Sequence, residues 1–206
     1  MAISNNALVS LENVIYNLGG YNNISMLECG DQRIRPLHNQ YAKEYFNNKE
    51  IKHHVSFDLN GMGGSIKEDL SKAIDVKKYG LFDIVTNFGT LEHIKEQYTV
   101  LLNIHNFCRV DGVMIHSLPL YEYWPNHGHY NYKLEFLIKI ADACDYKIIF
   151  YDARAKMAIK RIDRKVKYKF LIVAALKKKN GNQFMSRETF DKIAKNYIVL
   201  NKGLRK

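Results

Sequence analysis

The stretch from Ile24 to Asp31 constrains the fold of this chain more than any other. It reads Ile-Ser-Met-Leu-Glu-Cys-Gly-Asp, a short apolar run followed by a carboxylate and a glycine turn. In an open parallel sheet, ligands bind just beyond the carboxyl ends of the strands, where a turn leads into a helix. A glycine there lets the backbone approach a ligand, and a carboxylate accepts hydrogen bonds from it. We therefore expect a buried strand that ends at a ligand site beside Glu28 and Gly30.

The rest of the chain alternates between strand-like and helix-like segments. The expected strands are short and apolar, and lie at about 24–29, 54–59, 67–70, 82–87, 113–118, 147–151 and 168–175. The expected helices have apolar residues at a helical spacing, and lie at about 3–18, 37–47, 91–105, 131–144 and 186–206. The last two strands have no useful helix between them, only the short basic stretch 153–165, which predicts an antiparallel hairpin at the sheet edge. The pattern predicts an α/β fold: a Rossmann-like three-layer sandwich around a mostly parallel seven-stranded sheet with a closing antiparallel hairpin.

The length of 206 residues suits one domain with a full core. We expect residues 1–180 to form this domain, with an N-terminal helix at 1–20. Residues 181–206 are expected to form a basic C-terminal helix or tail.

Positive charge is concentrated near the C-terminus. Residues 1–150 carry 14 Lys and Arg against 17 Asp and Glu, whereas residues 151–206 carry 17 against 4, and the net charge is +10. Such a basic region indicates either an anionic partner, such as RNA, at 153–206 or a solvated lysine-rich face.

Several classes of protein are not supported by the sequence. No apolar run reaches the roughly 18 residues that span a bilayer. The first 18 residues contain an acidic residue and no basic one, unlike a secretory signal. Cys29, Cys108 and Cys144 are far apart in apolar settings, which predicts buried free thiols in a reducing cytoplasm and no zinc site. There is no Walker loop, His-Glu-x-x-His or Gly-x-Ser-x-Gly motif.

The order of the expected strands, helices and strand-end carboxylates resembles that of one protein family. Phe82–Ile94 reads FDIVTNFGTLEHI, a strand that runs into a Leu-Glu-His-Ile helix start, and Cys108–Ile115 reads CRVDGVMI, with a glycine turn before the next strand. The carboxylates Glu28 and Asp58 end the first and second strands. Over roughly residues 24–176, the chain resembles the class I S-adenosylmethionine-dependent methyltransferases.

The resemblance implies a cofactor, S-adenosylmethionine, and its contacts. The implied cofactor residues are Glu28, Gly30, Asn87 and Gly89 for the methionine part, Asp58 for both ribose hydroxyls, and Leu59, Asp69 and Leu70 for the adenine. The resemblance also implies that His93 faces the substrate instead of solvent.

The glycine motif departs from the family pattern, which is acidic-x-Gly-x-Gly-x-Gly. Only Gly30 remains, because Gln32 and Ile34 occupy the other glycine positions. The spacing from Glu28 to Asp58 is also longer than usual for the family. We therefore expect the first loop to take a different path.

A dense polar and aromatic stretch, Pro125–Tyr132, follows the strand at 113–118. His127 and His129 are the candidate catalytic residues, because an imidazole there can take a proton from a substrate hydroxyl or amine. The alternative is that this stretch is a structural loop or packs against the substrate. His-x-His can also bind a metal, but no third ligand at a suitable spacing is evident, and we expect no metal site. The aromatic residues Tyr123, Trp124 and Tyr130 form either a wall for a substrate ring or sugar, or a flap over the core.

The predicted function is methyl transfer from S-adenosylmethionine to oxygen or nitrogen of a small molecule or sugar. In such a reaction the cofactor carries the activated methyl group. The protein aligns the reactants and provides a place for the proton, so no nucleophile motif is required. One alternative is an RNA methyltransferase that uses the basic C-terminal region, and another is a non-catalytic binding protein of the same fold. The missing Gly-x-Gly-x-x-Gly argues against a nicotinamide-dependent oxidoreductase.

Overall fold

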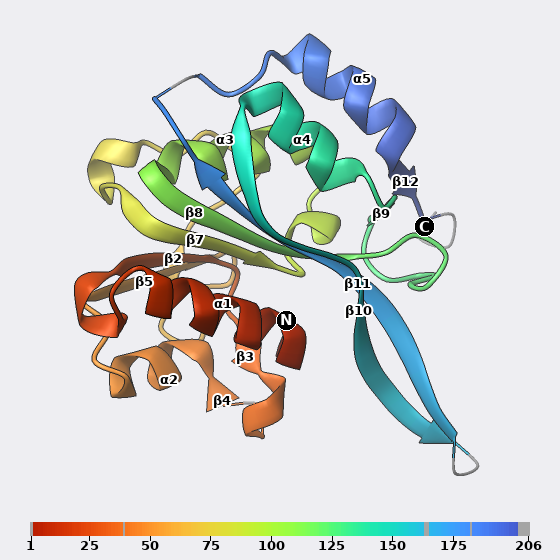
Figure 1. The fold of residues 1–206 in the computed structure, drawn as a ribbon, viewed down its shortest axis with the longest axis horizontal. Coiled ribbons are helices and arrows are strands. Elements are labelled where there is room, and N and C mark those ends of the chain that lie inside the picture. The colour runs from red at the N-terminus through yellow and green to blue at the C-terminus, as the bar shows by residue number, and fades with distance from the viewer. Residues whose placement is uncertain (1, 39, 163–164, 182, 202–206) are drawn as a thin grey trace.

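A seven-stranded sheet forms the centre of the molecule (Figure 1). The computed structural model describes residues 2–38, 40–162, 165–181 and 183–201. In chain order the strands of this sheet are β2 (Ser25–Cys29), β5 (His53–Asp58), β6 (Ile66–Lys67), β7 (Phe82–Phe88), β8 (Cys108–Pro119), β10 (Tyr146–Ile162) and β11 (Lys165–Lys178). Their order across the sheet is β10-β11-β8-β7-β2-β5-β6. The strands from β8 to β6 are parallel, whereas β11 is antiparallel to both β8 and β10. The predicted mixed sheet with an edge hairpin is confirmed.

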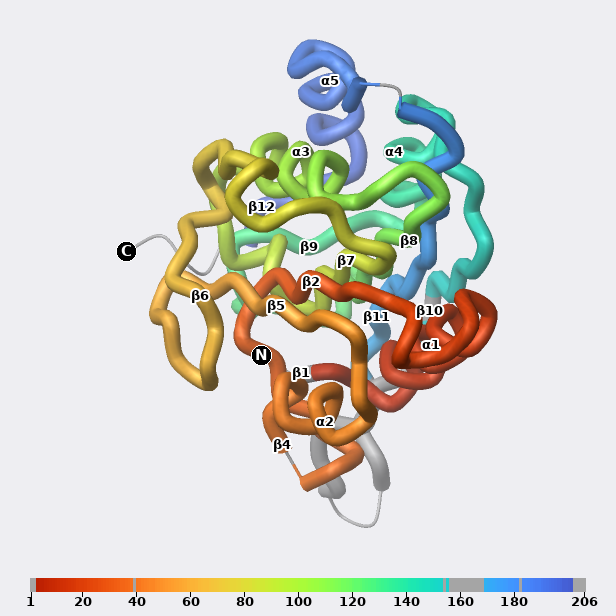
Figure 2. The backbone as a smooth tube through the Cα atoms, turned by 90° about the vertical axis from the view of Figure 1, so that its left-hand side faces the viewer, coloured from red at the N-terminus to blue at the C-terminus, as the bar shows by residue number. Residues whose placement is uncertain are grey.

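Helices cover both faces of the sheet, which gives three layers (Figure 1). On one face, α1 (Asn5–Asn17) and α2 (Ala42–Asn48) bury their apolar side chains against β2, β7 and β8. On the other face, α3 (Gln97–Phe107) and α4 (Phe136–Cys144) do the same. A further helix, α5 (Arg187–Tyr197), packs on α4. Figure 2 shows the two helical layers on opposite sides of the strands. The predicted three-layer sandwich is confirmed.

The carboxyl ends of the central parallel strands meet at one edge. In the register of the sheet, Cys29 at the end of β2 lies between Phe57 of β5 and Asn87 of β7. The residues that follow each strand, including Gly30 and Asp58, therefore lie side by side. This edge is where ligands bind in open α/β sheets.

The loop after β2 takes a different path, as expected from its altered glycine motif. Its strand β3 (Arg33–Ile34) pairs with β1 (Ala2–Ile3) and with β4 (Gln40–Tyr41) to form a small separate sheet. A 3₁₀ turn, η2 (Arg35–Leu37), lies between β3 and β4. The helix expected from residue 37 is therefore wrong at its start, because the strand pairings and the 3₁₀ turn precede α2, which begins at Ala42.

The start of the helix expected at 91–105 also differs from the prediction. A 3₁₀ turn, η4 (Leu91–His93), stands where the helix was expected to begin at 91, and α3 begins only at Gln97. The Asn87 Oδ1 accepts a hydrogen bond from the Leu91 backbone N–H, and the Gln97 side chain donates to two carbonyl oxygens of this turn. These side-chain bonds replace the bonds that a helix would make.

The helices expected at 131–144 and 186–206 are also too long. Tyr130–Tyr132 is a strand, β9, that pairs with β12 (Ile198–Leu200), so α4 begins at Phe136 and α5 ends at Tyr197. Residues 202–206 of the expected tail lie outside the described residues. The boundary at 180 stays a prediction; α5 contributes Phe190 to the core that α3 and α4 share.

The edge hairpin is longer than expected. The basic stretch at 153–165 is largely β10, which continues to Ile162, and with β11 it extends beyond the body of the molecule as a two-stranded ribbon (Figure 1). All three cysteines are free and buried, as predicted. Among the described residues, no helix combines the length and the apolar character needed to cross a bilayer.

Candidate functional site

A pocket of about 200 Å³ lies at the carboxyl ends of the parallel strands. Its lining comes from the ends of β2, β5 and β7 and from the loop around β6. The lining residues are Gly30, Phe57, Asp58, Leu59, Glu68, Asp69, Leu70, Thr90, His93 and Ile94. The pocket thus brings together five of the eight predicted cofactor residues and one predicted substrate residue.

Asp58 is held in place at the end of β5 by backbone donors. Its Oδ2 accepts a hydrogen bond from the Asp31 N–H at 2.8 Å, and its Oδ1 accepts one from the Asn60 N–H at 3.0 Å. Each carboxylate oxygen has a further lone pair to offer. Gly30 beside it has φ +100°, a conformation that glycine adopts without strain. The Asp58 carboxylate is therefore a hydrogen-bond acceptor that is held in a fixed position at the pocket.

The rest of the pocket combines an apolar surface with acidic groups. Leu70 is buried, while Leu59 is 65% exposed at the pocket. The Asp69 carboxylate accepts hydrogen bonds from the backbone and hydroxyl of Ser71, and the hydroxyl bond holds the pKa of Asp69 below its usual value. Glu68 is paired with Lys78 at 2.7 Å. A planar apolar group with polar edges is complementary to this surface.

The other predicted cofactor residues do not line the pocket. The side chain of Glu28 is buried, with its Oε2 2.9 Å from His54 Nε2, and burial raises its pKa although His54 acts in the opposite direction. Asn87 is buried too, with its Nδ2 3.2 Å from His116 Nδ1. Gly89 donates its N–H to the Ser117 carbonyl oxygen. These three residues support the strand ends behind the pocket.

Gln32, which stands at a glycine position of the family motif, is also buried behind the pocket. Its Nε2 donates to the Cys29 carbonyl oxygen and to Thr90 Oγ1, at 3.4 Å each. Thr90 Oγ1 in turn donates to the same carbonyl oxygen. Thr90 is a pocket residue that the sequence analysis missed, since a single threonine in a loop carries no distinctive pattern.

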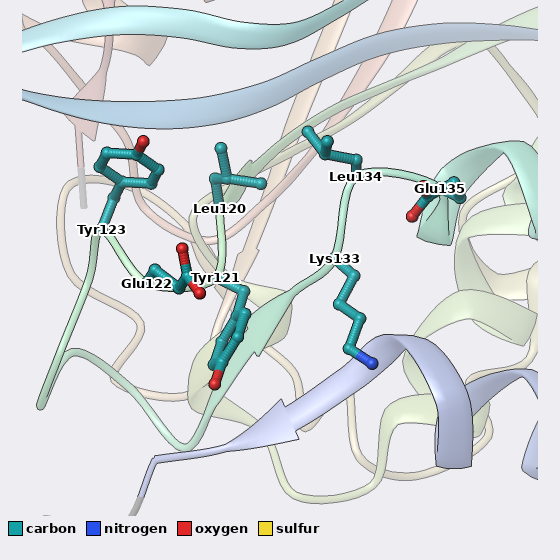
Figure 3. A pocket seen from close by; sticks show the side chains of 7 residues that line it. All are labelled: Leu120, Tyr121, Glu122, Tyr123, Lys133, Leu134 and Glu135. Atoms are coloured by element: carbon teal, nitrogen blue, oxygen red, sulfur yellow. The ribbon is translucent and has the colours of Figure 1, made fainter.

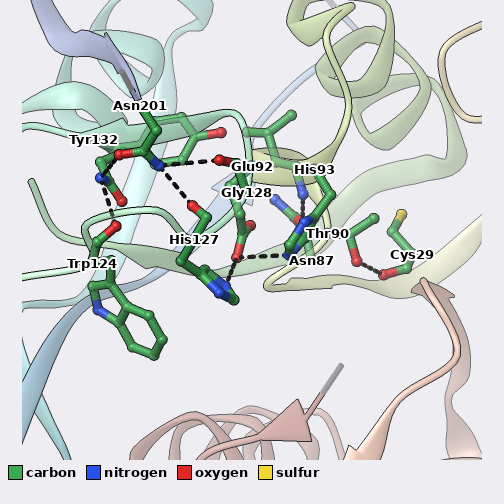
Figure 4. Close-up of polar contacts among 12 residues, drawn as sticks. Cys29, Asn87, Thr90, Glu92, His93, Trp124, His127, Gly128, Tyr132 and Asn201 are labelled. Atoms are coloured by element: carbon green, nitrogen blue, oxygen red, sulfur yellow. Dashed lines mark hydrogen bonds and ion pairs between the residues drawn. The ribbon is translucent and has the colours of Figure 1, made fainter. Parts of the chain in front are cut away.

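A polar cluster adjoins the pocket (Figure 4). Glu92, whose side chain is 2% exposed, directs Oε1 toward two imidazoles: His127 Nε2 lies 3.5 Å away and His93 Nε2 lies 4.0 Å away. The two rings meet edge to face, with centroids 4.9 Å apart. Burial lowers the pKa of His93, and the Glu92 charge opposes this shift. His93 belongs to both the cluster and the pocket, so the two are continuous.

The loop that carries His127 is fixed by the C-terminal segment. Asn201 donates from Nδ2 to the carbonyl oxygens of His127 and Gly128, at 2.7 and 3.2 Å. The His129 N–H donates to the Glu92 carbonyl oxygen at 2.6 Å. Of the two predicted catalytic histidines, His127 therefore has its ring in the cluster, whereas His129 contacts Glu92 through its backbone.

The predicted aromatic substrate residues lie in different surroundings. Trp124 is buried among Ala155, Leu171 and Val173, with its ring 4.8 Å from that of His127. Tyr130 lies by Lys95, to whose carbonyl oxygen its hydroxyl donates at 3.4 Å. These side chains do not form one common wall.

Tyr123 lines a second pocket, of about 270 Å³, beside the start of α4 (Figure 3). Its ring meets that of Phe170 at 4.6 Å between centroids. Tyr121, Glu122 and Lys133 line the same pocket. A substrate contact for Tyr123, Trp124 or Tyr130 stays a prediction.

Comparisons with known proteins support the fold. No family model and no curated protein matches the sequence. Among solved structures, TehB from Haemophilus influenzae is 12% identical with a TM-score of 0.57, over 81% of this chain and 61% of TehB, so the chain spans less than two thirds of that protein. The 1,6-didemethyltoxoflavin-N1-methyltransferase from Burkholderia thailandensis is 17% identical with a TM-score of 0.53, over 84% of this chain and 79% of the other.

A third similar structure is the N-methyltransferase NodS from Bradyrhizobium japonicum. It is 14% identical with a TM-score of 0.54, over 84% of this chain and 85% of NodS. Both this structure and the Burkholderia one contain S-adenosylhomocysteine. Because all three identities are below 25%, the likeness concerns architecture. The chain has the fold of the class I S-adenosylmethionine-dependent methyltransferases.

Proposed function

We propose that this protein transfers a methyl group from S-adenosylmethionine to oxygen or nitrogen of a small molecule or sugar. The observation that carries the proposal is the pocket at the strand ends, in which Asp58 is fixed by two backbone donors beside Gly30. The residues present fit the nucleoside half of the cofactor. The Asp58 carboxylate can accept from both ribose hydroxyls, while Leu59 and Leu70 offer apolar surface to the adenine.

The methionine half of the cofactor would lie toward Gly30 and Thr90. Glu28 and Asn87 support this side from behind and have no part of the pocket surface, which argues for indirect roles. The bound cofactor supplies an activated methyl group on a sulfonium. The chain supplies alignment of the acceptor and a route for its proton.

The Glu92–His127 pair is the candidate for handling that proton. Glu92 is buried, and its Oε1 lies 3.5 Å from His127 Nε2, so the carboxylate orients this ring toward the cluster. His129 lacks such a partner for its ring among the described contacts. We therefore favour His127 over His129 as the residue that acts at the acceptor.

The first test is calorimetric titration of the full chain with S-adenosylmethionine and S-adenosylhomocysteine, with NAD as the control. We expect micromolar affinity for both sulfur nucleosides and no heat from NAD. Because cofactor binding precedes methyl transfer, absence of binding by either sulfur nucleoside would contradict the proposed activity and favour a non-catalytic binding protein.

An RNA acceptor is the second candidate, and the β10–β11 ribbon favours it. The sequence from 152 to 169 contains two aspartates and eight basic residues: Arg154, Lys156, Lys160, Arg161, Arg164, Lys165, Lys167 and Lys169. A basic strand pair that extends from the body offers charge to a phosphate backbone. Such binding weakens steeply with salt, because bound counterions are released.

For this candidate, a triple variant with Arg161, Lys165 and Lys167 replaced by glutamine is expected to bind single-stranded RNA more weakly. The slope of log affinity against log salt should become shallower by about 2, because each phosphate that a cation neutralises contributes roughly 0.7 to the slope for a single strand. The matched control replaces Lys49, Lys52 and Lys77, which are exposed outside the ribbon. Equal slopes for the two triple variants, or no RNA binding at low salt, would remove the RNA candidate.

A further inference from the structure

We propose that Glu92, His93 and His127 bind a divalent cation of the first transition row, with Zn²⁺ as the probe of choice. One ligand atom from each of these residues lies within 4.8 Å of the other two. Two come from η4, and the third comes from a loop that follows 34 positions later in the chain. The sequence alone does not reveal the set, because the ligands lie in two distant segments and only the fold brings them together.

The donor set has the chemistry of a metal site. Two imidazoles and one carboxylate are a common ligand set for zinc and for other metals of this row. With metal–ligand bonds of about 2.1 Å, tetrahedral ligands are about 3.4 Å apart. The Glu92 Oε1 is already 3.5 Å from His127 Nε2 and 4.0 Å from His93 Nε2. All three ligand atoms lie within 4.8 Å of one another, so rotation of the side chains would have to bring them closer together around an ion.

The buried carboxylate of Glu92 is the second observation that indicates a cation. Its Oε2 is buried and makes no hydrogen bond to any described residue. Within the described part of the chain, its ion-pair partners are the two histidines, and no lysine or arginine reaches it. Burial of a carboxylate without a counterion is unfavourable. A divalent cation bound by the cluster would offset this cost.

The surroundings of the cluster restrain the ligands in the way that outer contacts do in metal sites. The His129 N–H holds the Glu92 backbone, and Asn201 holds the backbone of His127 and Gly128. Such outer contacts orient ligands and contribute to affinity. The three protein ligands leave coordination positions open for a water or a substrate atom.

The position of the cluster suggests what the cation does. Since His93 also lines the strand-end pocket, the ion would lie at the border of that pocket. An acceptor hydroxyl bound to it would have a lowered pKa, and His127 would then act as a ligand instead of a free base. This consequence rests on the proposed methyl transfer, whereas cation binding itself does not.

The test is titration of the chelator-treated full chain with Zn²⁺ alone, by calorimetry and by the shift in melting temperature. We expect one equivalent to bind and to raise the melting temperature, since a ligand that binds the folded state stabilises it. Glu92→Gln and His127→Asn each remove a ligand. They are expected to weaken Zn²⁺ binding by more than the roughly 10- to 100-fold that removal of an outer hydrogen-bond partner costs.

The controls remove histidines that are not in the cluster. His129→Asn comes from the same loop, and His38→Asn lies at an exposed left-handed position that asparagine tolerates. Both are expected to bind Zn²⁺ like the parent chain. Equal Zn²⁺ affinity in the parent and in His127→Asn would overturn the proposal, as would absence of stoichiometric binding. If Glu92→Gln does not fold, His127→Asn still decides the outcome.

Titration of the same samples with S-adenosylhomocysteine keeps the two proposals separate. Zn²⁺ binding without nucleoside binding would support the cation site and contradict the methyltransferase proposal. Nucleoside binding without Zn²⁺ binding would contradict the cation site and support the methyltransferase proposal. His127 would then remain the candidate proton acceptor.

Discussion

Replacement of Asp58 by alanine is expected to weaken the binding of S-adenosylhomocysteine by about 100-fold or more. A hydrogen bond to a charged group contributes about 1.5–3 kcal/mol, and the proposed role gives Asp58 two such bonds to the ribose. The loss of at least about 3 kcal/mol corresponds to about 100-fold, since 1.4 kcal/mol is tenfold. The measurement is calorimetric titration of parent and variant under the same conditions.

Two further variants show whether the effect belongs to the ligand. Asp58→Asn retains an oxygen that can accept from Asp31 or Asn60, so the loop should stay in place while the charge is lost, and we expect an intermediate affinity. Asp142→Asn makes the same change on the exposed side of α4, and it should bind like the parent chain. Unchanged affinity in Asp58→Ala would show that this carboxylate does not bind the ribose.

Gly128→Ala is expected to disrupt the polar cluster without affecting the nucleoside pocket. Gly128 has φ +64°, and a Cβ built there would lie 2.7 Å from the Glu92 carbonyl oxygen and 2.9 Å from Glu92 Cγ. The first of these atoms is backbone, so the loop must move. Zn²⁺ binding should be lost, because His127 moves with the loop. Affinity for S-adenosylhomocysteine should be retained, because Gly128 does not line that pocket.

The stability of this variant should also fall. The left-handed backbone costs a non-glycine residue roughly 1–2 kcal/mol, and the steric conflict adds to it. At about 2–4 °C per kcal/mol for a chain of this size, we expect this backbone cost alone to lower the melting temperature by about 2–8 °C. Gly80→Ala is the control: its φ is +80°, but nothing lies within 4 Å of the added Cβ. If both variants melt alike and both bind Zn²⁺, then the loop does not control the cluster.

The architecture was predictable because its signals are local. Apolar, β-branched runs such as 82–87 favour strands wherever they occur, and helix faces such as that of α1 repeat every three to four residues. Asp58 and Gly30 could be assigned to one site for a related reason. Each directly follows a strand, and the carboxyl ends of parallel strands meet at one edge of the sheet.

The direction of individual side chains was not predictable in the same way. Glu28 and Asn87 also stand at strand ends, yet both turn inward to partners on neighbouring strands, His54 and His116. Which face a side chain takes depends on these cross-strand neighbours. Local pattern contains no information about them.

Pairings between distant segments depend on the tertiary structure alone. The apolar spacing of 131–144 and 186–206 is compatible with helix throughout. However, β9 and β12 exchange backbone hydrogen bonds, so α4 begins later and α5 ends earlier than this spacing predicts. Strand pairing of this kind is non-local, so composition and periodicity cannot reveal it. The same holds for the polar cluster: of the His-x-His motif only His127 belongs to it, and the tertiary structure alone brings His127 to Glu92 and His93.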